Sequence, residues 1–149
     1  MLVVDTPSAL KSHVGALLGS SDWLLIDQKM IDLFAEATGD HQWIHVDTAR
    51  ASREMAGGKT VAHGYLLISL IPRLMIGVLK IERRTRALNY GLNKVRFVSP
   101  VACGSRVRLI VTLQKAEEVA SGLRCIFNNQ LDLEGAAKPA MVAETVTIS

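Results

Sequence analysis

Cysteine, proline and aromatic residues are scarce in this 149-residue sequence. The two cysteines, Cys103 and Cys125, lack the paired spacing of zinc ligands, so neither a disulfide framework nor a metal centre is expected. Reduced thiols in a cytoplasmic protein are the better interpretation. Only four prolines beside eleven glycines exclude a fibrous or low-complexity chain. Because aromatic residues make up only 5% of the sequence, the core has to be built mainly from aliphatic side chains.

The sequence also lacks the usual features of secretion or membrane insertion. Its first ten residues contain no basic region followed by an apolar one, so we expect no secretory signal. The most apolar stretch, residues 61–79, contains His63, Pro72 and Arg73, which are costly in a bilayer, and is interpreted as a buried helix. With 49% hydrophobic and 21% charged residues, the composition excludes intrinsic disorder and predicts one folded domain over residues 1–149.

Positive charge is concentrated in one part of the chain. Residues 73–108 carry nine basic side chains and one acidic one, whereas the segments 1–62 and 109–149 are both net negative. Such a block attracts anions, and a solvated basic face and a phosphate-binding surface both stay open. Nucleic-acid binding is the weakest hypothesis, because the block offers only Tyr90 and Phe97 as stacking platforms and no helix-turn-helix pattern is present.

The first half of the sequence predicts mainly helices. We expect an opening helix over residues 6–18 and a brief strand over residues 23–27. Asp27 is predicted to cap a helix that Gly39 ends, and Asp47 to cap a short helix after an intervening loop. The helix after Gly64 is apolar nearly all round, which predicts that protein surrounds it and that Pro72 kinks it or closes it early.

After about residue 85 the pattern changes to strands. Four long segments alternate apolar and polar residues or are rich in β-branched ones, with turn residues between them. This order predicts an α+β fold in which an antiparallel sheet wraps around the long apolar helix. Four long strands leave unpaired edges, so we expect a homodimer with one continuous sheet.

Two short segments carry the candidate catalytic groups. In GDHQWIHVD, residues 39–47, Asp40 and His45 lie on one loop, where a carboxylate and an imidazole can hold a water molecule. In VAHGY, residues 61–65, Gly64 opens the apolar helix, where free N–H groups can stabilise a carbonyl that gains negative charge. Hydration or dehydration beside a carbonyl requires these two functions.

Each of these residues has a simpler interpretation when it is taken alone. Asp40 can be a turn residue after Gly39, His45 a hydrogen-bonded loop histidine, and His63 a helix-start residue bonded to a loop carbonyl. The combination favours a catalytic role, because the Asp–x4–His pattern is followed eighteen residues later by Ala-His-Gly at the start of a strongly apolar helix.

These segments, together with NYGLNKVRF and the late KPAMVAE, resemble the MaoC-like dehydratases, or (R)-specific enoyl-CoA hydratases, of the hot-dog fold. The resemblance covers nearly the whole chain. It is strongest to the short single-domain bacterial members, which include probable enoyl-CoA hydratases and nodulation-protein-N-like proteins. Gln42-Trp43 stand where many members have Asn-Pro, while the spacing from Asp40 to His45 is kept. This departure bears on acyl-chain preference more than on catalysis.

The resemblance implies a role for each catalytic candidate. Asp40 and His45 would hold and activate the water, and the Gly64 N–H would polarise the thioester carbonyl. It implies a homodimer and no metal or redox cofactor, with coenzyme A entering only as part of the substrate. The chemistry of phosphate recognition separately suggests that arginines of the basic block contact coenzyme A. The substrate-binding candidates are His63, Asn89, Tyr90, Asn93, Arg83, Arg84 and Arg86.

Three functional hypotheses remain after these observations. The leading one is a hydratase that reversibly converts a trans-2-enoyl thioester, carried by coenzyme A or acyl carrier protein, into the (R)-3-hydroxyacyl thioester of fatty-acid-type metabolism. A hot-dog thioesterase is the alternative enzyme, but it usually needs a carboxylate on or near the central helix, and residues 63–80 contain none. A non-catalytic acyl-CoA-binding module is the third, against which the intact Asp40, His45 and Gly64 argue.

Overall fold

The computed structural model describes residues 1–149 and contains eight strands, five α-helices and one 3₁₀ helix. Four long strands fill the second half of the chain, as expected, whereas the first half contains short strands as well as the expected helices. The elements in chain order are β1 (Leu2–Val4), η1 (Pro7–His13), β2 (Leu17–Ser20), β3 (Leu24–Leu25), α1 (Gln28–Thr38), α2 (Trp43–Val46), α3 (Thr48–Glu54), α4 (Gly64–Ser69), α5 (Ile71–Met75), β4 (Leu79–Ile81), β5 (Leu88–Phe97), β6 (Arg106–Val119), β7 (Gly122–Leu133) and β8 (Met141–Ile148).

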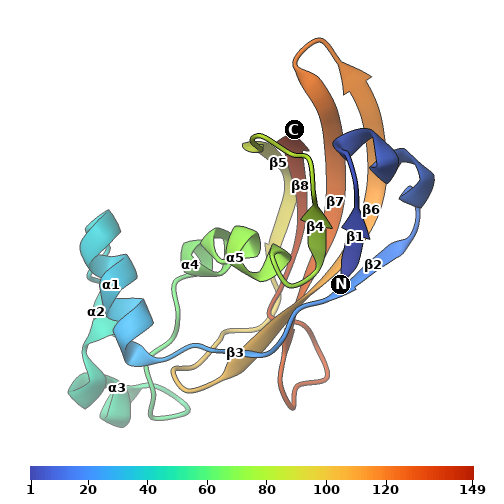
Figure 1. Cartoon of the computed structure of the whole chain (residues 1–149). Helices are drawn as coiled ribbons and strands as arrows, with labels where there is room; N and C mark the ends of the chain where they lie inside the picture. The colour runs from blue at the N-terminus through green and yellow to red at the C-terminus, as the bar shows by residue number, and fades with distance from the viewer.

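The main sheet is antiparallel and has the strand order β2-β6-β7-β8-β5, with β3 also pairing to β6. Alternate residues of β7 are buried, among them Leu123, Cys125 and Phe127, so one face of the sheet is a continuous apolar wall. The helices α4 and α5 lie against this face, and α1 to α3 gather beyond one end of it (Figure 1). The predicted α+β plan, with an apolar helix on an antiparallel sheet, is therefore confirmed.

The two predicted helix caps are confirmed in the structure. The Asp27 side chain accepts a hydrogen bond of 2.9 Å from the Met30 N–H at the start of α1, and Gly39 ends this helix at φ 77°. The Asp47 side chain accepts a bond of 2.9 Å from the Arg50 N–H at the start of α3. Both ends of the segment that carries Asp40 and His45 are thus anchored by helix termini.

Three predictions about the elements were wrong. The expected opening helix is a 3₁₀ helix followed by β2, because backbone groups of residues 15–20 pair with β6. The expected strand at residues 23–27 is reduced to the two residues of β3. The expected loop between α1 and α3 contains the single turn of α2, on which His45 lies. In each case tertiary pairing or a short-range turn overrode the local pattern.

The central helix is shorter than its apolar sequence suggests. It breaks after α4 and ends with α5 at Met75, as the position of Pro72 predicted, and the chain then enters β4. One side of it is buried, but Tyr65 and Ile76 on the other side are 72% and 73% exposed. The prediction that protein surrounds this helix is therefore wrong for the single chain, which leaves one helical face uncovered. No helix is both long enough and apolar enough to cross a bilayer.

The strand β5 forms a bare edge of the main sheet. It pairs only with β8, whereas β2 and β3 cover the opposite edge at β6. Nine of its ten residues are exposed, including Leu88, Tyr90 and Phe97. An exposed strand of this length with large apolar side chains is a surface on which another strand can pair.

Candidate active site

Asp40 lies immediately after Gly39, at the point where α1 ends. Its Oδ1 accepts a hydrogen bond of 3.3 Å from the Gln42 N–H, so the simple turn role expected of this residue is present. The carboxyl is nevertheless 50% exposed, and Oδ2 lies 4.0 Å from Nε2 of His63. Oδ2 is therefore free to interact with a molecule at the surface.

His45 is held by its backbone and by one ring nitrogen. Its Nδ1 lies 2.6 Å from the carbonyl oxygen of Val61, and because a carbonyl can only accept, Nδ1 carries the proton. Nε2 then has a free lone pair that can accept a proton or hold water. The residue as a whole is only 7% exposed.

Two residues that the sequence did not single out fix the backbone of α2. The amide of Gln28 donates hydrogen bonds of 2.8 Å to the carbonyl of His45 and to Oδ1 of Asp32. The buried Thr60 hydroxyl donates a bond of 2.5 Å to Oε1 of Gln28. No local pattern marks this role of Gln28, because the His45 carbonyl and Thr60 are 17 and 32 residues away in the chain.

His63 is buried next to Asp40 and His45 and does not lie at the surface. Its side chain is 2% exposed, and Nε2 lies 3.0 Å from the backbone carbonyl of Asp40, to which it donates. Its ring stacks on that of His45 with centroids 3.8 Å apart, and Phe34 packs against it at 4.9 Å. The expectation of a helix-start residue bonded to a loop carbonyl is confirmed, whereas this burial contradicts the expected direct contact between His63 and substrate.

Gly64 is the first residue of α4, and its N–H has no acceptor within the chain. A Cβ at this position would lie 2.9 Å from Cε2 and Cζ of Phe97, which comes from the end of β5. A larger residue at position 64 would therefore require the Phe97 ring to move. The sequence did not assign Phe97 to the site, since the contact joins residues 33 positions apart.

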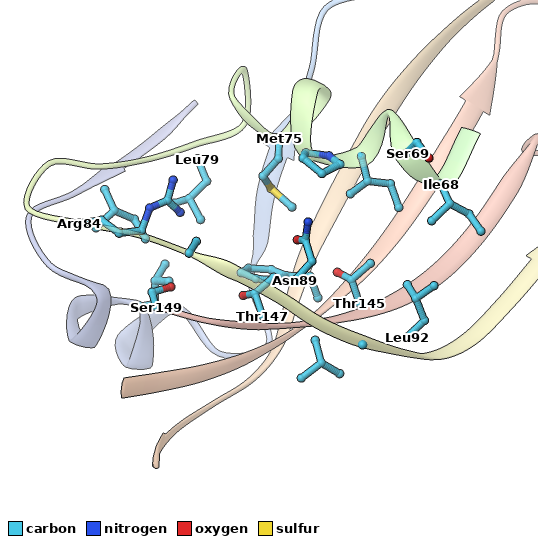
Figure 2. Close-up of a pocket in the computed structure, with 18 residues that line it drawn as sticks. Ile68, Ser69, Met75, Leu79, Arg84, Asn89, Leu92, Thr145, Thr147 and Ser149 are labelled. Atoms are coloured by element: carbon cyan, nitrogen blue, oxygen red, sulfur yellow. The ribbon is translucent and has the colours of Figure 1, made fainter. Parts of the chain in front are cut away.

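A cavity of about 670 Å³ begins one turn beyond Gly64, between α4, α5 and the strands β5 and β8. Figure 2 shows Met75 from α5 and Asn89 from β5 pointing toward each other across it. The walls are mostly apolar, with polar groups at Ser69, Asn89 and Thr147. From Ile68 to Met75 the helices advance about 10 Å, at roughly 1.5 Å per residue, and the cavity continues to Arg84.

The structure separates the other substrate-binding candidates. Asn89 and Arg84 line the cavity. The Asn93 amide donates a bond of 2.6 Å to Glu144, and Tyr90 is 66% exposed on the bare edge, so neither faces the cavity. Arg83 is paired with Asp5 at 2.8 Å, which leaves it little capacity for a phosphate.

The basic block is partly neutralised by carboxylates. Four of its nine basic side chains form ion pairs, namely Lys80 with Glu82, Arg83 with Asp5, Arg106 with Glu134 and Arg108 with Asp132. Arg86 is exposed and has no carboxylate partner. The other five basic side chains have no carboxylate partner, and among these five only Arg84 lines the cavity.

Asp40, His45 and His63 bring three possible ligand atoms within 4.8 Å of one another. The two imidazoles are stacked with an interplanar angle of 23°, and Nε2 of His63 lies 3.0 Å from the Asp40 carbonyl oxygen. The spacing also allows one water molecule to bridge the Asp40 carboxylate and the His45 imidazole.

The chain is similar to known proteins over nearly its whole length. The family model described as "MaoC like domain" matches residues 10–130. The chain is 44% identical over 149 residues to 3-hydroxyacyl-thioester dehydratase Z of Mycobacterium tuberculosis, covering 98% of this chain and 97% of that protein. It is 45% identical over 148 residues to Nodulation protein N of Rhizobium leguminosarum bv. viciae, covering 98% of this chain and 89% of that protein.

The chain therefore belongs to the MaoC-like domain family. Among solved structures, R-hydratase PhaJ1 from Pseudomonas aeruginosa superposes with a TM-score of 0.73 at 23% identity, over 91% of this chain and 81% of that chain. This similarity confirms the predicted hot-dog fold.

Proposed function

We propose that the protein is an (R)-specific enoyl-thioester hydratase, which acts reversibly as a 3-hydroxyacyl-thioester dehydratase. The observation that carries this proposal is that an Asp40 carboxylate oxygen and a His45 ring nitrogen lie within 4.8 Å of each other, while the N–H of Gly64, the residue after His63, has no acceptor in the chain. His63 contacts both Asp40 and His45 and directly precedes Gly64, so the three groups belong to one site. The 44% identity to a named 3-hydroxyacyl-thioester dehydratase supports the same reaction.

Each group has one role in the hydration direction. A water molecule held between Asp40 and His45 loses a proton to this pair as its oxygen adds to C3 of the enoyl thioester. The electron pair of the double bond moves toward the thioester oxygen, where the Gly64 N–H donates to the developing negative charge. The pair then returns the proton to C2, so one water is added and no electron is gained or lost. Dehydration is the reverse sequence.

This balance requires no cofactor. Only a proton moves between the enzyme and the substrate, and two side chains and one backbone N–H suffice to move it and to stabilise the charge. Coenzyme A or acyl carrier protein enters the reaction as the carrier of the acyl group. We further propose that the enzyme works in the cytoplasm, in fatty-acid-type metabolism.

We propose that the acyl chain lies in the cavity between α4, α5, β5 and β8. The thioester carbonyl would bind at the Gly64 N–H. The cavity starts one turn further along the helix, and its walls are mostly apolar. This placement puts Arg84 near the end of the acyl chain and not beside the phosphates of coenzyme A. We therefore propose that Arg84 lies beside the acyl chain and does not make the contact with the coenzyme A phosphates that the sequence suggested.

A homodimer is proposed from the two uncovered surfaces of the chain. The bare edge of β5 and the exposed Tyr65 adjoin each other through Phe97, whose ring lies at right angles to Tyr65 with centroids 6.4 Å apart. Edge-to-edge pairing of β5 with a second copy would extend the sheet and cover these side chains. Sedimentation at micromolar concentration is expected to give a dimer, and a species of 16.2 kDa alone would contradict it.

The decisive experiment is a direct assay of hydration. Loss of absorbance of the conjugated enoyl thioester is measured at several chain lengths, and the product is analysed on a chiral column. We expect the (R)-3-hydroxyacyl thioester and its loss in the Asp40→Asn variant. Release of free thiol without hydration, surviving in that variant, would instead establish the thioesterase, and binding of acyl-CoA without turnover would establish the non-catalytic module.

A further inference from the structure

We propose that His63 is a positioning residue, which holds the Asp40 carbonyl and the His45 ring in register with the Gly64 N–H, and that it does not bind substrate. The inference rests on the proposed hydratase function. It assigns a role to a buried histidine that the mechanism itself does not use. The carrying observation is that one residue is connected to every part of the site: its ring contacts Asp40 and His45, and its backbone continues into Gly64.

The first contact fixes Asp40. Nε2 of His63 donates to the Asp40 carbonyl at 3.0 Å, and this is the only hydrogen bond that the ring makes, because Nδ1 is buried without a partner. A single bond in a dry environment determines which way the ring faces and where the loop lies. The Asp40 carboxyl itself is half exposed and has only a weak bond of 3.3 Å to Gln42, so it depends on its backbone for placement.

The second contact fixes His45. The two imidazoles stack with centroids 3.8 Å apart, and Phe34 also packs against His63 with centroids 4.9 Å apart. His45 is already held by Nδ1 to Val61, so the stack limits rotation of the ring about that bond. The lone pair of Nε2 is thereby kept aimed in one direction.

The third link is covalent. His63 directly precedes Gly64, and its carbonyl accepts hydrogen bonds from the N–H groups of Leu66 and Leu67 in α4, at 3.1 and 3.3 Å. The ring is thus rigidly connected to the helix whose first N–H is free. If His63 moves, the groups that hold water move relative to the group that stabilises the carbonyl. A misplacement of about 1 Å in such a constellation costs on the order of 10²-fold in rate.

The test compares three substitutions that separate the N–H from the ring. In His63→Gln the amide nitrogen reaches as far as Nε2 and can still donate to Asp40, whereas in His63→Asn it is too short. His63→Phe keeps an aromatic ring against His45 but has no donor. We expect kcat for hydration to fall about 10²-fold in the Asn and Phe variants and less than about tenfold in Gln, with KM nearly constant in all three. His13→Gln, far from the site, is the control.

A double-mutant cycle distinguishes positioning from a general structural role. If His63 acts through Asp40, His63→Phe should cost almost nothing further when Asp40→Asn is already present. An additive loss in that background would overturn the proposal. A rise in KM at constant kcat would also overturn it, because it would identify a substrate contact. Equal activity of the Gln and Asn variants would do the same, because it would show that the N–H donor is not needed.

Nuclear magnetic resonance gives a readout that needs no activity. The amide resonances of residues 39–42 are expected to broaden in His63→Phe and His63→Asn and to stay sharp in His63→Gln. If they do so while the wild-type protein hydrates no enoyl thioester, the positioning contact stands and the proposed function fails. If they are unchanged in all three variants, the loop does not depend on His63 and the proposal is wrong.

Discussion

The site where water is held and the cavity beside it are built in opposite ways. Asp40, His45 and His63 are fixed by short contacts that each involve a named atom, such as the bond of 2.6 Å from His45 to Val61. The cavity is instead a surface of side chains from five regions of the chain, with few hydrogen bonds among them. Catalysis therefore depends on the exact positions of a few atoms, whereas selection of the acyl chain depends on a cavity shape to which many residues contribute.

The largest effect is expected from the water-holding pair. Asp40→Asn keeps the size of the side chain but can no longer accept a proton, and His45→Ala removes the other contact to the same water. Each should lower kcat for hydration by about 10²–10⁴-fold, and the double variant little more, because the groups act on one molecule. Steady-state kinetics over several chain lengths should show the same loss for every substrate. Activity within a few-fold of wild type in both folded variants would contradict the assignment.

The next effect concerns Gly64 and tests whether crowding acts on the substrate or on Phe97. Gly64→Ala places a Cβ 2.9 Å from the end of the Phe97 ring, which is half exposed and can swing away. We expect a folded protein whose kcat falls on the order of 10²-fold, comparable to loss of one oxyanion-hole donor.

In the double variant Gly64→Ala/Phe97→Leu, a smaller side chain replaces the Phe97 ring and leaves room for the new Cβ. Thermal stability should recover in it, while kcat stays low because the methyl group still obstructs the carbonyl. Recovery of kcat along with stability would mean that Phe97, and not the substrate, sets the requirement for glycine.

Substitutions in the cavity should change which acyl-chain lengths the enzyme accepts, and they should not abolish the reaction. Thr147→Trp fills the space opposite Met75, so kcat/KM for long acyl chains should fall about tenfold or more while short chains are hardly affected. Thr112→Trp on β6 is the matched control, because it lies between the buried Val111 and Leu113 and therefore faces away from the cavity. An equal loss at all chain lengths would show that the acyl group does not enter this cavity.

Arg84→Gln should give a smaller effect of the same kind. Because Arg84 lines the far end of the cavity, we expect a few-fold change confined to the longest chains and equal for coenzyme A thioesters and for thioesters lacking the nucleotide. A KM that rises only for the coenzyme A thioesters would return this arginine to the phosphate-binding role that the sequence suggested.

The smallest effect is expected at Cys125, on the inner face of strand β7, and it concerns the reactivity of the thiol. Burial, with a smaller contribution from the Glu118 carboxylate, raises the pKa of the Cys125 thiol to about 11. Since the thiolate is the reactive form, Cys125 should resist alkylation at pH 8 while the half-buried Cys103 reacts first, as mass spectrometry of timed samples would show. Equal rates would mean that solvent reaches the inner face of the sheet.

The parts of the protein that depend on local chemistry could be predicted from the sequence. The caps at Asp27 and Asp47, the end of α1 at Gly39 and the early close of the helix at Pro72 all follow from interactions within a few residues. The four long strands and the motif containing Asp40 and His45 were visible for the same reason. The turn role of Asp40 and the loop-carbonyl bond of His63 were also anticipated, although the sequence placed substrate against His63.

Tertiary packing set the contacts between residues that are distant in the chain. It stacked His63 on His45, brought Gln28 to the His45 carbonyl and seated Phe97 against Gly64, contacts that join positions 17 to 33 residues apart. It also turned residues 17–20 into strand β2 by pairing them with β6, and it left β5 and one side of the central helix bare. Local patterns cannot contain this information, because each such contact is selected by the packing of the whole sheet and not by the preference of either residue.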